Sequence, residues 1–322
     1  MTDSEKSDML RAMTHSTHAY APDPRNDNIL IDINGALFPR NDAKISVFDS
    51  GFVLGDGVWE GLRVYAGADG KGVIVLLAQH LKRLYDGAKT LDFEMNVSKE
   101  QLKKRLYDCI DANGAHDGVH IRLMISRGVK ATPYQDPRAT ITPPTIVIIP
   151  EFKKPTAETA SKGARLFTVH VRRGYPDVQD PKLNSHSKLN CITACIQAAK
   201  AGADEALMLD PHGFVATCNS THFFIVRDGA LWTSTGDYCL GGITRGVILE
   251  IARASGIETI EKNFSLHDVY GADEAFITGT FAGISPVSEV DGRCISSTRG
   301  PMVEKLQALY RQHIAEELAK GR

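Results

Sequence analysis

The stretch Asn184–Val226, NSHSKLNCITACIQAAKAGADEALMLDPHGFVATCNSTHFFIV, carries most of the information about the fold. Its pattern predicts a short polar turn, a helix of small residues, a strand, a turn at Asp210–Gly213 and a second strand. Lys188 stands at the front of the predicted helix, with Ser185 and Ser187 as candidate N-caps. A lysine one turn into a helix lies near the positive end of the helix dipole, which lowers its pKa and favours imine formation. The alternative for such a lysine is a solvated side chain.

The composition is typical of a globular protein and lacks the positive charge that favours binding to nucleic acid or to a membrane. The chain has 322 residues, 43% hydrophobic and 24% charged, which is enough for one or two domains, and we expect two. A formal net charge of −2 gives no positive field to attract nucleic acid or an anionic membrane. We therefore expect the partners to be small molecules and another subunit.

The cysteines and the apolar runs predict the setting of the protein. Six cysteines are scattered without a Cys-x-x-Cys pair or a Cys/His cluster at metal-ligand spacing, so we predict no metal site and a reducing, cytoplasmic setting. The first 26 residues lack an apolar core of signal-peptide length, and no apolar run approaches a membrane span. We expect residues 1–27 to be a flexible arm.

Residues 28–152 have the pattern of a small α+β domain. Apolar residues alternate around Asn34-Gly35, which predicts a hairpin, and another strand is expected to begin at Ile45. Residues 76–93 and 99–114 predict two helices, the second ending at Gly114. Further strands are predicted on both sides of these helices, and strands followed by helices and then by strands indicate the α+β class.

Residues 153–162 are rich in proline and polar residues and predict a linker. The remaining residues, 163–322, predict a larger domain of strands and helices. Its expected elements are a strand at 165–173, the central helix, strands at 205–210 and 223–234, a helix at 244–256, a strand at 274–280 and a last helix at 302–320.

Five blocks in this order resemble the fold-type IV pyridoxal-phosphate enzymes, which include branched-chain and D-amino-acid aminotransferases, R-selective amine transaminases and aminodeoxychorismate lyase. The resemblance runs from about Ile29 to Ala315. It implies an α+β N-terminal domain, an α/β C-terminal domain with a β-barrel-like sheet, pyridoxal 5′-phosphate as cofactor, and a homodimer with its active site at the domain junction. The blocks are SVFDSGFVLGDGVWEGLRVY (46–65), AQHLKRLYDGAK (78–89), GADEALMLD (202–210), GGITRGVILEIA (241–252) and ADEAFITGTFAGISPVSEVDGR (272–293).

Three parts of the chain match the phosphate-binding positions of the family. Arg83 matches the arginine that binds the phosphate, and guanidinium binds phosphate in a bidentate way. Ile243 and Thr244 open a helix behind two glycines, where free N–H groups attract an anion. Thr280 matches the threonine of the phosphate loop. The alternatives are a surface arginine for Arg83 and a Thr N-cap for the glycine turn.

Trp59, Arg63 and Arg122 match positions that line the substrate pocket of the branched-chain enzymes. Arg122 matches an arginine that receives the second carboxylate of glutamate, and the alternative is a structural salt bridge with Glu60 or Asp49.

The D-amino-acid aminotransferases carry an Arg-x-His pair for the α-carboxylate, and this chain has Thr132 and Tyr134 there. The resemblance therefore disfavours a D-amino-acid substrate.

Two positions depart from the family pattern. Counted back from Gly202, the family lysine falls at Leu183 or Asn184, neither of which forms an imine. Lys188 lies where the branched-chain enzymes have a tyrosine beside the aldehyde, so we favour it as the imine-forming lysine over its competitor Lys182.

The second departure is Thr217, which replaces the glutamate that keeps the pyridine nitrogen protonated. Threonine forms only a hydrogen bond there, so the ring is a weaker electron sink.

These residues predict a pyridoxal-phosphate-dependent transaminase of the branched-chain-like group. Lys188 would form the imine and shuttle the proton as general base and acid. The residues predicted to bind the cofactor are Arg83, Lys188, Thr217, Ile243, Thr244 and Thr280. The alternatives are a lyase or racemase on the same scaffold, which Thr217 makes credible, and a catalytically decayed relative that is not an enzyme.

Overall fold

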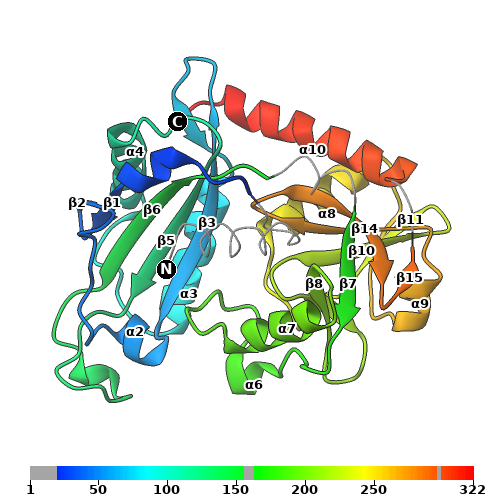
Figure 1. Cartoon of the computed structure of the whole chain (residues 1–322), viewed down its shortest axis with the longest axis horizontal. Helices are drawn as coiled ribbons and strands as arrows, with labels where there is room; N and C mark the ends of the chain where they lie inside the picture. Colours follow the sequence, from blue (N-terminus) through cyan, green and yellow to red (C-terminus); the bar gives the residue numbers. More distant parts are fainter. Residues whose placement is uncertain (1–19, 156–162, 296–298) are drawn as a thin grey trace. The chain divides into compact units, whose positions relative to one another are not determined.

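The computed structural model describes residues 20–155, 163–295 and 299–322, and it divides the chain into two compact units (Figure 1). The small unit comprises Pro22–Lys154, Leu183–Lys188 and Ile314–Arg322. The large unit comprises Pro155–Lys182 and Leu189–His313, together with the described residues up to Ala21. The predicted boundaries differ, because they assign 183–188 and 314–322 to the large domain. The expected arm and linker lie mainly outside the described residues.

The small unit is built on an antiparallel sheet in the order β2-β1-β6-β5-β3-β4. Helices α3 and α4 supply the core behind it (Figure 1). The bounds are η2 (Pro24–Asn28), β1 (Leu30–Ile33), β2 (Ala36–Pro39), α2 (Ser50–Leu54), β3 (Gly57–Ala66), β4 (Gly72–Ile74), α3 (Leu77–Thr90), α4 (Lys99–Ala112), β5 (Val119–Ser126), η3 (Pro137–Ala139) and β6 (Thr145–Phe152).

Local signals account for several of these elements. Asn34 and Gly35 both have positive φ between paired β1 and β2, as a two-residue hairpin loop requires. Ser98 begins α4 with a capping box, and Gly114 follows the helix at φ 55°. The predicted hairpin and both predicted helices are confirmed.

Two local expectations do not hold. No strand begins at Ile45, because the Asp49 carboxylate accepts a hydrogen bond from Gly51 N–H at 2.9 Å and caps the short helix α2 instead. Residues 24–28, mostly assigned to the flexible arm, form the 3-10 helix η2. Its buried Asn26 exchanges side-chain hydrogen bonds with the Phe152 backbone.

The two faces of the small sheet differ because side chains alternate along a strand. On β3, Glu60 and Leu62 point to the helix side and are completely buried, whereas Trp59 is half-buried on the opposite face. The pairing of β3 with β5 places Arg122 directly opposite Gly61 and Met124 opposite Trp59. The face away from the helices therefore carries the predicted substrate residues.

The segment Leu183–Lys188 returns to the small unit and pairs with the beginning of β3. Trp59 N–H donates to Asn184 C=O at 3.0 Å, and His186 N–H donates to Gly57 C=O at 2.9 Å. Between these bonds Val58 and Ser185 form an antiparallel bridge. The segment that carries Lys188 is thus held to β3 as a short added strand.

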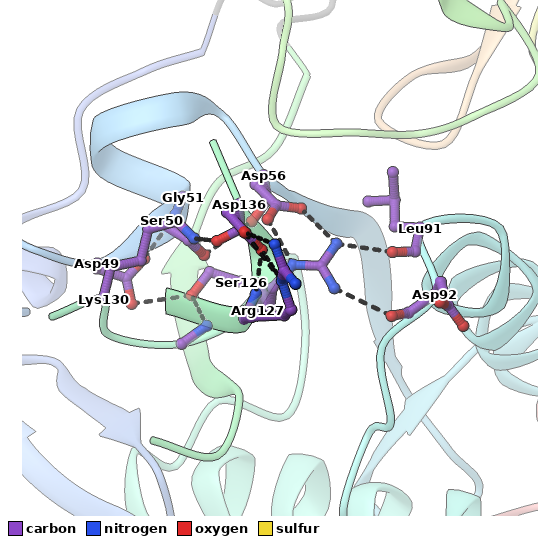
Figure 2. A network of polar contacts seen from close by, with 12 residues as sticks. Asp49, Ser50, Gly51, Asp56, Leu91, Asp92, Ser126, Arg127, Lys130 and Asp136 are labelled. Atoms are coloured by element: carbon purple, nitrogen blue, oxygen red, sulfur yellow. Dashed lines mark hydrogen bonds and ion pairs between the residues drawn. The ribbon is translucent and has the colours of Figure 1, made fainter. Parts of the chain in front are cut away.

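A network of polar contacts fixes the chain on both sides of α2 and at the end of β5 (Figure 2). The Arg127 guanidinium donates to Asp56 at 2.6 and 3.2 Å and to the carbonyls of Leu91 and Asp92 at 2.7 and 3.0 Å. Ser126 Oγ donates to Asp49 Oδ2 at 2.8 Å. These bonds join the C-terminal end of β5 to the segments before and after α2 and after α3.

The large unit contains a nine-stranded sheet in the described residues, in the order β12-β11-β10-β13-β14-β7-β8-β9, with β15 paired to β14. Its last strand, β9, turns directly into β10 through a hydrogen bond from Cys218 N–H to Thr221 C=O, which curls the sheet towards a barrel. The bounds are β7 (Ala164–Thr168), α6 (Pro176–Gln179), α7 (Leu189–Lys200), β8 (Glu205–Leu209), β9 (Val215–Cys218), β10 (His222–Arg227), β11 (Ala230–Thr233), α8 (Ile243–Ala254), β12 (Thr259–Glu261), α9 (Leu266–Tyr270), β13 (Glu274–Gly279), β14 (Gly283–Val290), β15 (Arg293–Cys294) and α10 (Pro301–Ala319).

Strand β10 shows how the curled sheet is filled. Phe223 and Ile225 belong to the core cluster that α9 completes, whereas Phe224 and Val226 belong to the cluster that also contains residues of α8 and α10 (Figure 1). Both faces of this strand are therefore buried, as expected for a central strand with layers on both sides.

Gly57 is predicted to tolerate no side chain. A Cβ at Gly57 would lie 2.5 Å from Ile125 O and 2.7 Å from the His186 ring. We expect Gly57→Ala to lower the free energy of unfolding by about 1–3 kcal/mol, as overpacking usually does. Denaturant unfolding measures the change. Gly174→Ala, where the added Cβ meets no atom within 4 Å, is the control; equal stability of the two variants would contradict the packing of His186 against Gly57.

Candidate active site

Lys188 lies beside Trp59 on the small unit. Its Nζ is 5.3 Å from the centre of the Trp59 ring and donates to Asn184 Oδ1 at 3.0 Å. The Arg122 guanidinium carbon is 3.9 Å from the centre of the same ring. Three of the sequence-predicted residues are therefore brought together here, with an amine and a guanidinium sharing one aromatic side chain.

The structure corrects the expected setting of Lys188. Helix α7 begins at Leu189, so Lys188 lies immediately before the helix and not one turn into it. Ser185, expected as an N-cap, is instead bridged to Val58 of β3. The segment that carries Lys188 is positioned by its pairing with β3.

Lys182, the competing lysine, is exposed and belongs to the large unit, whereas Lys188 is half-buried. The structure gives Lys182 a backbone hydrogen bond to Asp180 Oδ1 at 2.8 Å. The two lysines therefore differ in exposure, and the preference for Lys188 as the imine-forming lysine stays a prediction.

The same face of the small unit carries an excess of positive charge. Burial lowers the pKa of Lys153, and the nearby Arg122 and Arg63 lower it further, while Glu151 opposes them. Burial also lowers the pKa of Arg122, with Glu151 acting in the other direction. Three cations beside one carboxylate form a surface suited to an anion.

The expected alternative for Arg122, a salt bridge with Glu60 or Asp49, is not observed in the part of the chain that the structure describes. Glu60 binds His80 and Arg83, and Asp49 accepts from Ser126 and Gly51. Arg122 is stacked on Trp59 instead, so its donors remain suited to a ligand.

Arg63 is more deeply placed than Arg122. It is 3% exposed, and its Nη1 donates to the Lys153 carbonyl at 2.6 Å. Its guanidinium carbon is also 5.3 Å from the centre of the Tyr65 ring. Its predicted role at the substrate stays a prediction, and in this structure it supports the strand end that carries Lys153.

Arg83 forms a buried ion pair. Its Nε and Nη2 donate to the two carboxylate oxygens of Glu60 at 2.8 and 2.7 Å, and His80 Nδ1–H donates to Glu60 Oε2 at 2.7 Å. Burial opposes the charge of Glu60, but the hydrogen bonds from His80 and Arg83 outweigh it and hold its pKa below the ordinary value. Glu60 thus fixes the orientation of the predicted phosphate-binding arginine.

On the large unit, Thr217 is buried in β9. Its hydroxyl donates to the Thr221 carbonyl at 2.8 Å. Because the hydroxyl proton already takes part in this hydrogen bond, Thr217 Oγ1 can only accept a further one. Thr221 is itself fixed by the buried Glu205, which accepts its hydroxyl at 2.9 Å.

Helix α8 opens at Ile243 and Thr244, as predicted. Its N-cap is Gly242, and no side chain caps the first turn. A Cβ on Gly242 would lie 2.2 Å from His222 Nε2, whereas one on Gly241 would meet nothing within 4 Å. A side chain at 242 would collide with His222, so a glycine is required directly before the first turn of this helix. The N-terminus of a helix favours an anion.

Thr280 lies in the turn between β13 and β14, directly after Gly279. The preceding Thr278 is paired with His222 of β10, the residue that touches Gly242. The Thr278 hydroxyl is buried without a hydrogen-bond partner in the described residues. An uncapped helix terminus and an unsatisfied hydroxyl on adjoining elements fit the phosphate that the sequence predicts.

Several residues near Lys188 and Arg122 are not predicted from the sequence. Asn184 and His186 orient the Lys188 segment, and Lys153 adds to the cationic face. His186 donates from Nε2 to the Val58 carbonyl at 3.0 Å. The glycines at 51 and 57 were the available signal, because a Cβ on either would collide with the His186 ring.

Thr132 and Tyr134, which stand at the places of the family's Arg-x-His pair, are exposed. In the described residues, no group of three or more His, Cys, Asp and Glu side chains could hold a metal ion. The same residues contain no helix with the length and apolarity needed to cross a membrane.

The comparisons with known proteins place the chain in a family. Residues 57–290 match the sequence model of the family described as amino-transferase class IV. A putative branched-chain-amino-acid aminotransferase of Methanocaldococcus jannaschii is 41% identical over 283 residues, which cover 87% of this chain and 95% of that protein. This chain belongs to the class IV aminotransferases.

Two further relatives describe the extent of the similarity. Branched-chain-amino-acid aminotransferase-like protein 2 of Arabidopsis thaliana is 37% identical over 90% of this chain, which spans about half (51%) of the plant protein. The branched-chain amino acid aminotransferase of T.th., solved in complex with N-(5′-phosphopyridoxyl)-L-glutamate, is 33% identical. It superposes with a TM-score of 0.83 over 90% of this chain and 95% of that one.

These similarities confirm the predicted family and the fold-type IV architecture. The family is the one that the sequence predicted, and its T.th. member was solved with a phosphopyridoxyl ligand. The three relatives are named as aminotransferases or aminotransferase-like proteins. They do not favour the lyase, racemase or decayed alternatives.

The stability of the small unit should depend on two histidines, of which His80 is buried and His186 is half-buried. Burial lowers the pKa values of His80 and His186, so both are neutral when folded and bind protons on unfolding. An unfolded histidine titrates near pH ~6.5, and each such proton contributes up to about 1.4 kcal/mol per pH unit below it. We expect the free energy of unfolding to fall as the pH is lowered from about 7.5 to about 5.5.

Urea unfolding at several pH values measures this slope. His186→Gln keeps a donor for Val58 but does not titrate, and should flatten the slope by about one proton. An unchanged slope in this variant would contradict the neutral state of His186.

Proposed function

We propose that this protein is a pyridoxal-phosphate-dependent transaminase that moves an amino group between an amino acid and a 2-oxo acid, as branched-chain enzymes do. The observation that carries the proposal is the half-buried Lys188 amine, held by Asn184 and placed over Trp59. Half-burial in a polar and aromatic setting suits a reactive amine better than full solvation.

The cofactor, when bound, supplies an aldehyde that condenses with amines and a ring that accepts electrons. Lys188 would hold this aldehyde and would move a proton at the substrate α-carbon as general base and acid. The residues that hold the phosphate are Arg83, Ile243, Thr244 and Thr280. The first turn of α8 supports this assignment, because no side chain caps it and the N-terminus of a helix attracts an anion.

Thr217 faces the ring nitrogen in this proposal. Its hydroxyl hydrogen is bonded to Thr221, so it accepts a hydrogen bond but provides no negative charge. A neutral acceptor stabilises a protonated ring less than the family's glutamate does. We therefore expect a slower α-proton transfer than in a relative with that glutamate.

The substrate side is formed by Trp59, Arg63 and Arg122. Arg122 receives the second carboxylate of a dicarboxylic partner such as glutamate or its 2-oxo acid. Its stacking on Trp59 and the neighbouring Lys153 and Arg63 support this assignment, since they add positive charge where an anion would bind.

We also propose a homodimer in a reducing, cytoplasmic setting. The small unit exposes apolar side chains that water alone would disfavour, and an exposed apolar patch is typical of an interaction surface. All six cysteines are free, which suits a reducing compartment. The exposed apolar residues are Ile45, Val47, Phe48, Phe52 and Leu54.

Lys188→Ala should abolish covalent attachment of the cofactor. The protein is incubated with pyridoxal phosphate, reduced with borohydride and digested, and the labelled peptide is identified by mass spectrometry. We expect the label on Lys188 in the wild type, no label in Lys188→Ala, and a wild-type label in the control Lys182→Ala. A label that persists in Lys188→Ala would assign the reaction to another lysine and reject the proposed role.

Arg122→Leu should change the choice of acceptor. We expect KM for 2-oxoglutarate to rise about tenfold or more, as loss of a charged hydrogen bond predicts, with less than about threefold change for an apolar 2-oxo acid. Steady-state kinetics with both acceptors on the same preparation measure the difference. An equal rise for both acceptors would mean that Arg122 supports Trp59 and does not bind the second carboxylate.

A further inference from the structure

Asn184 makes three bonds that connect Lys188 to the sheet. Its backbone carbonyl accepts from Trp59 N–H at 3.0 Å, and its side-chain Nδ2 donates to Trp59 C=O at 2.6 Å. Its remaining side-chain atom, Oδ1, accepts from Lys188 Nζ at 3.0 Å. With 6% exposure, this amide is sheltered from water.

The chemistry of the amide fixes its direction. Only the nitrogen of an asparagine side chain donates, and the Trp59 carbonyl only accepts, so Nδ2 must face Trp59. Oδ1 must then face Lys188, which offers only donors. The rotation of the Asn184 side chain is therefore determined by strand β3, and the position of the lysine nitrogen is determined by Asn184.

We propose that Asn184 is the positioning residue for the Lys188 amine. We also propose that a lysine at position 184 or at position 188 can bring its amine to the same region. This inference rests on the proposed role of Lys188. The oxygen of a short side chain at 184 lies within hydrogen-bond distance of the lysine nitrogen. A lysine at 184, with its longer flexible stem, can therefore carry its own nitrogen into the same region.

A neutral amide suits this role better than a carboxylate. An aspartate at 184 would form an ion pair with Lys188 and favour its charged form, which is not nucleophilic. Asn184 thus directs the amine without supplying a counter-charge.

The first test removes the acceptor. Asn184→Ala is titrated with pyridoxal phosphate, and the borohydride-reduced label on Lys188 is quantified by mass spectrometry. We expect half-maximal labelling to need up to about tenfold more cofactor than in the wild type, as the loss of one hydrogen bond predicts. Asn190→Ala is the matched control, because Asn190 bonds the Arg172 carbonyl and Arg173 but not Lys188. Equal half-saturation in Asn184→Ala and the wild type would overturn the inference.

The second test moves the amine. The double variant Asn184→Lys with Lys188→Ala should recover a reduced label, now on residue 184, whereas Lys188→Ala alone carries none. A folded double variant without label would overturn the interchangeability of the two positions. A label that remains in Lys188→Ala would instead refute the proposed function, so the two failures are distinguished.

Discussion

The pairing of Leu183–Lys188 with the beginning of β3 is the constraint on which the site depends. The two backbone hydrogen bonds of one antiparallel bridge join residues far apart in the sequence, and the Trp59 indole adds a bond to Ser185 C=O at 3.0 Å. Closing so long a loop costs conformational entropy, which the bonds of the pairing and the packing of His186 must offset. The strand that presents Trp59 therefore also determines where the lysine amine lies.

This pairing explains why the small unit has a glycine in α2 and another at the start of β3. His186 enters the space beside Gly51 and Gly57, and its Nε2 bonds to the Val58 carbonyl. Any larger residue at either glycine would exclude the ring. A glycine loses more conformational entropy on folding than other residues do. Here the two glycines make room for the His186 ring, a contact that the local sequence does not reveal.

Much of the fold follows from local signals and from the family resemblance. The Asn34-Gly35 hairpin and the caps of α4 are determined within a few residues, so the sequence predicts them correctly. The strand expected at Ile45 failed because the Asp49 side chain caps a short helix. Lys188 was assigned to a helix turn because its partner, Trp59, is distant in the sequence. The direction of the Asn184 amide depends on its contact with the same Trp59, so the local sequence does not predict it either.

The buried pair of Glu60 and Arg83 shows why a matched residue type does not by itself define a role. A buried carboxylate without a partner is costly, so Glu60 needs Arg83 and His80 whatever ligand is present. The pairing also orders the guanidinium, which would reduce the entropy lost on binding the proposed phosphate. Arg122 differs, since it has an aromatic partner and no bonded carboxylate in the described residues. Of the two arginines, Arg122 therefore gains more from an incoming anion, and Arg83 contributes through its fixed orientation.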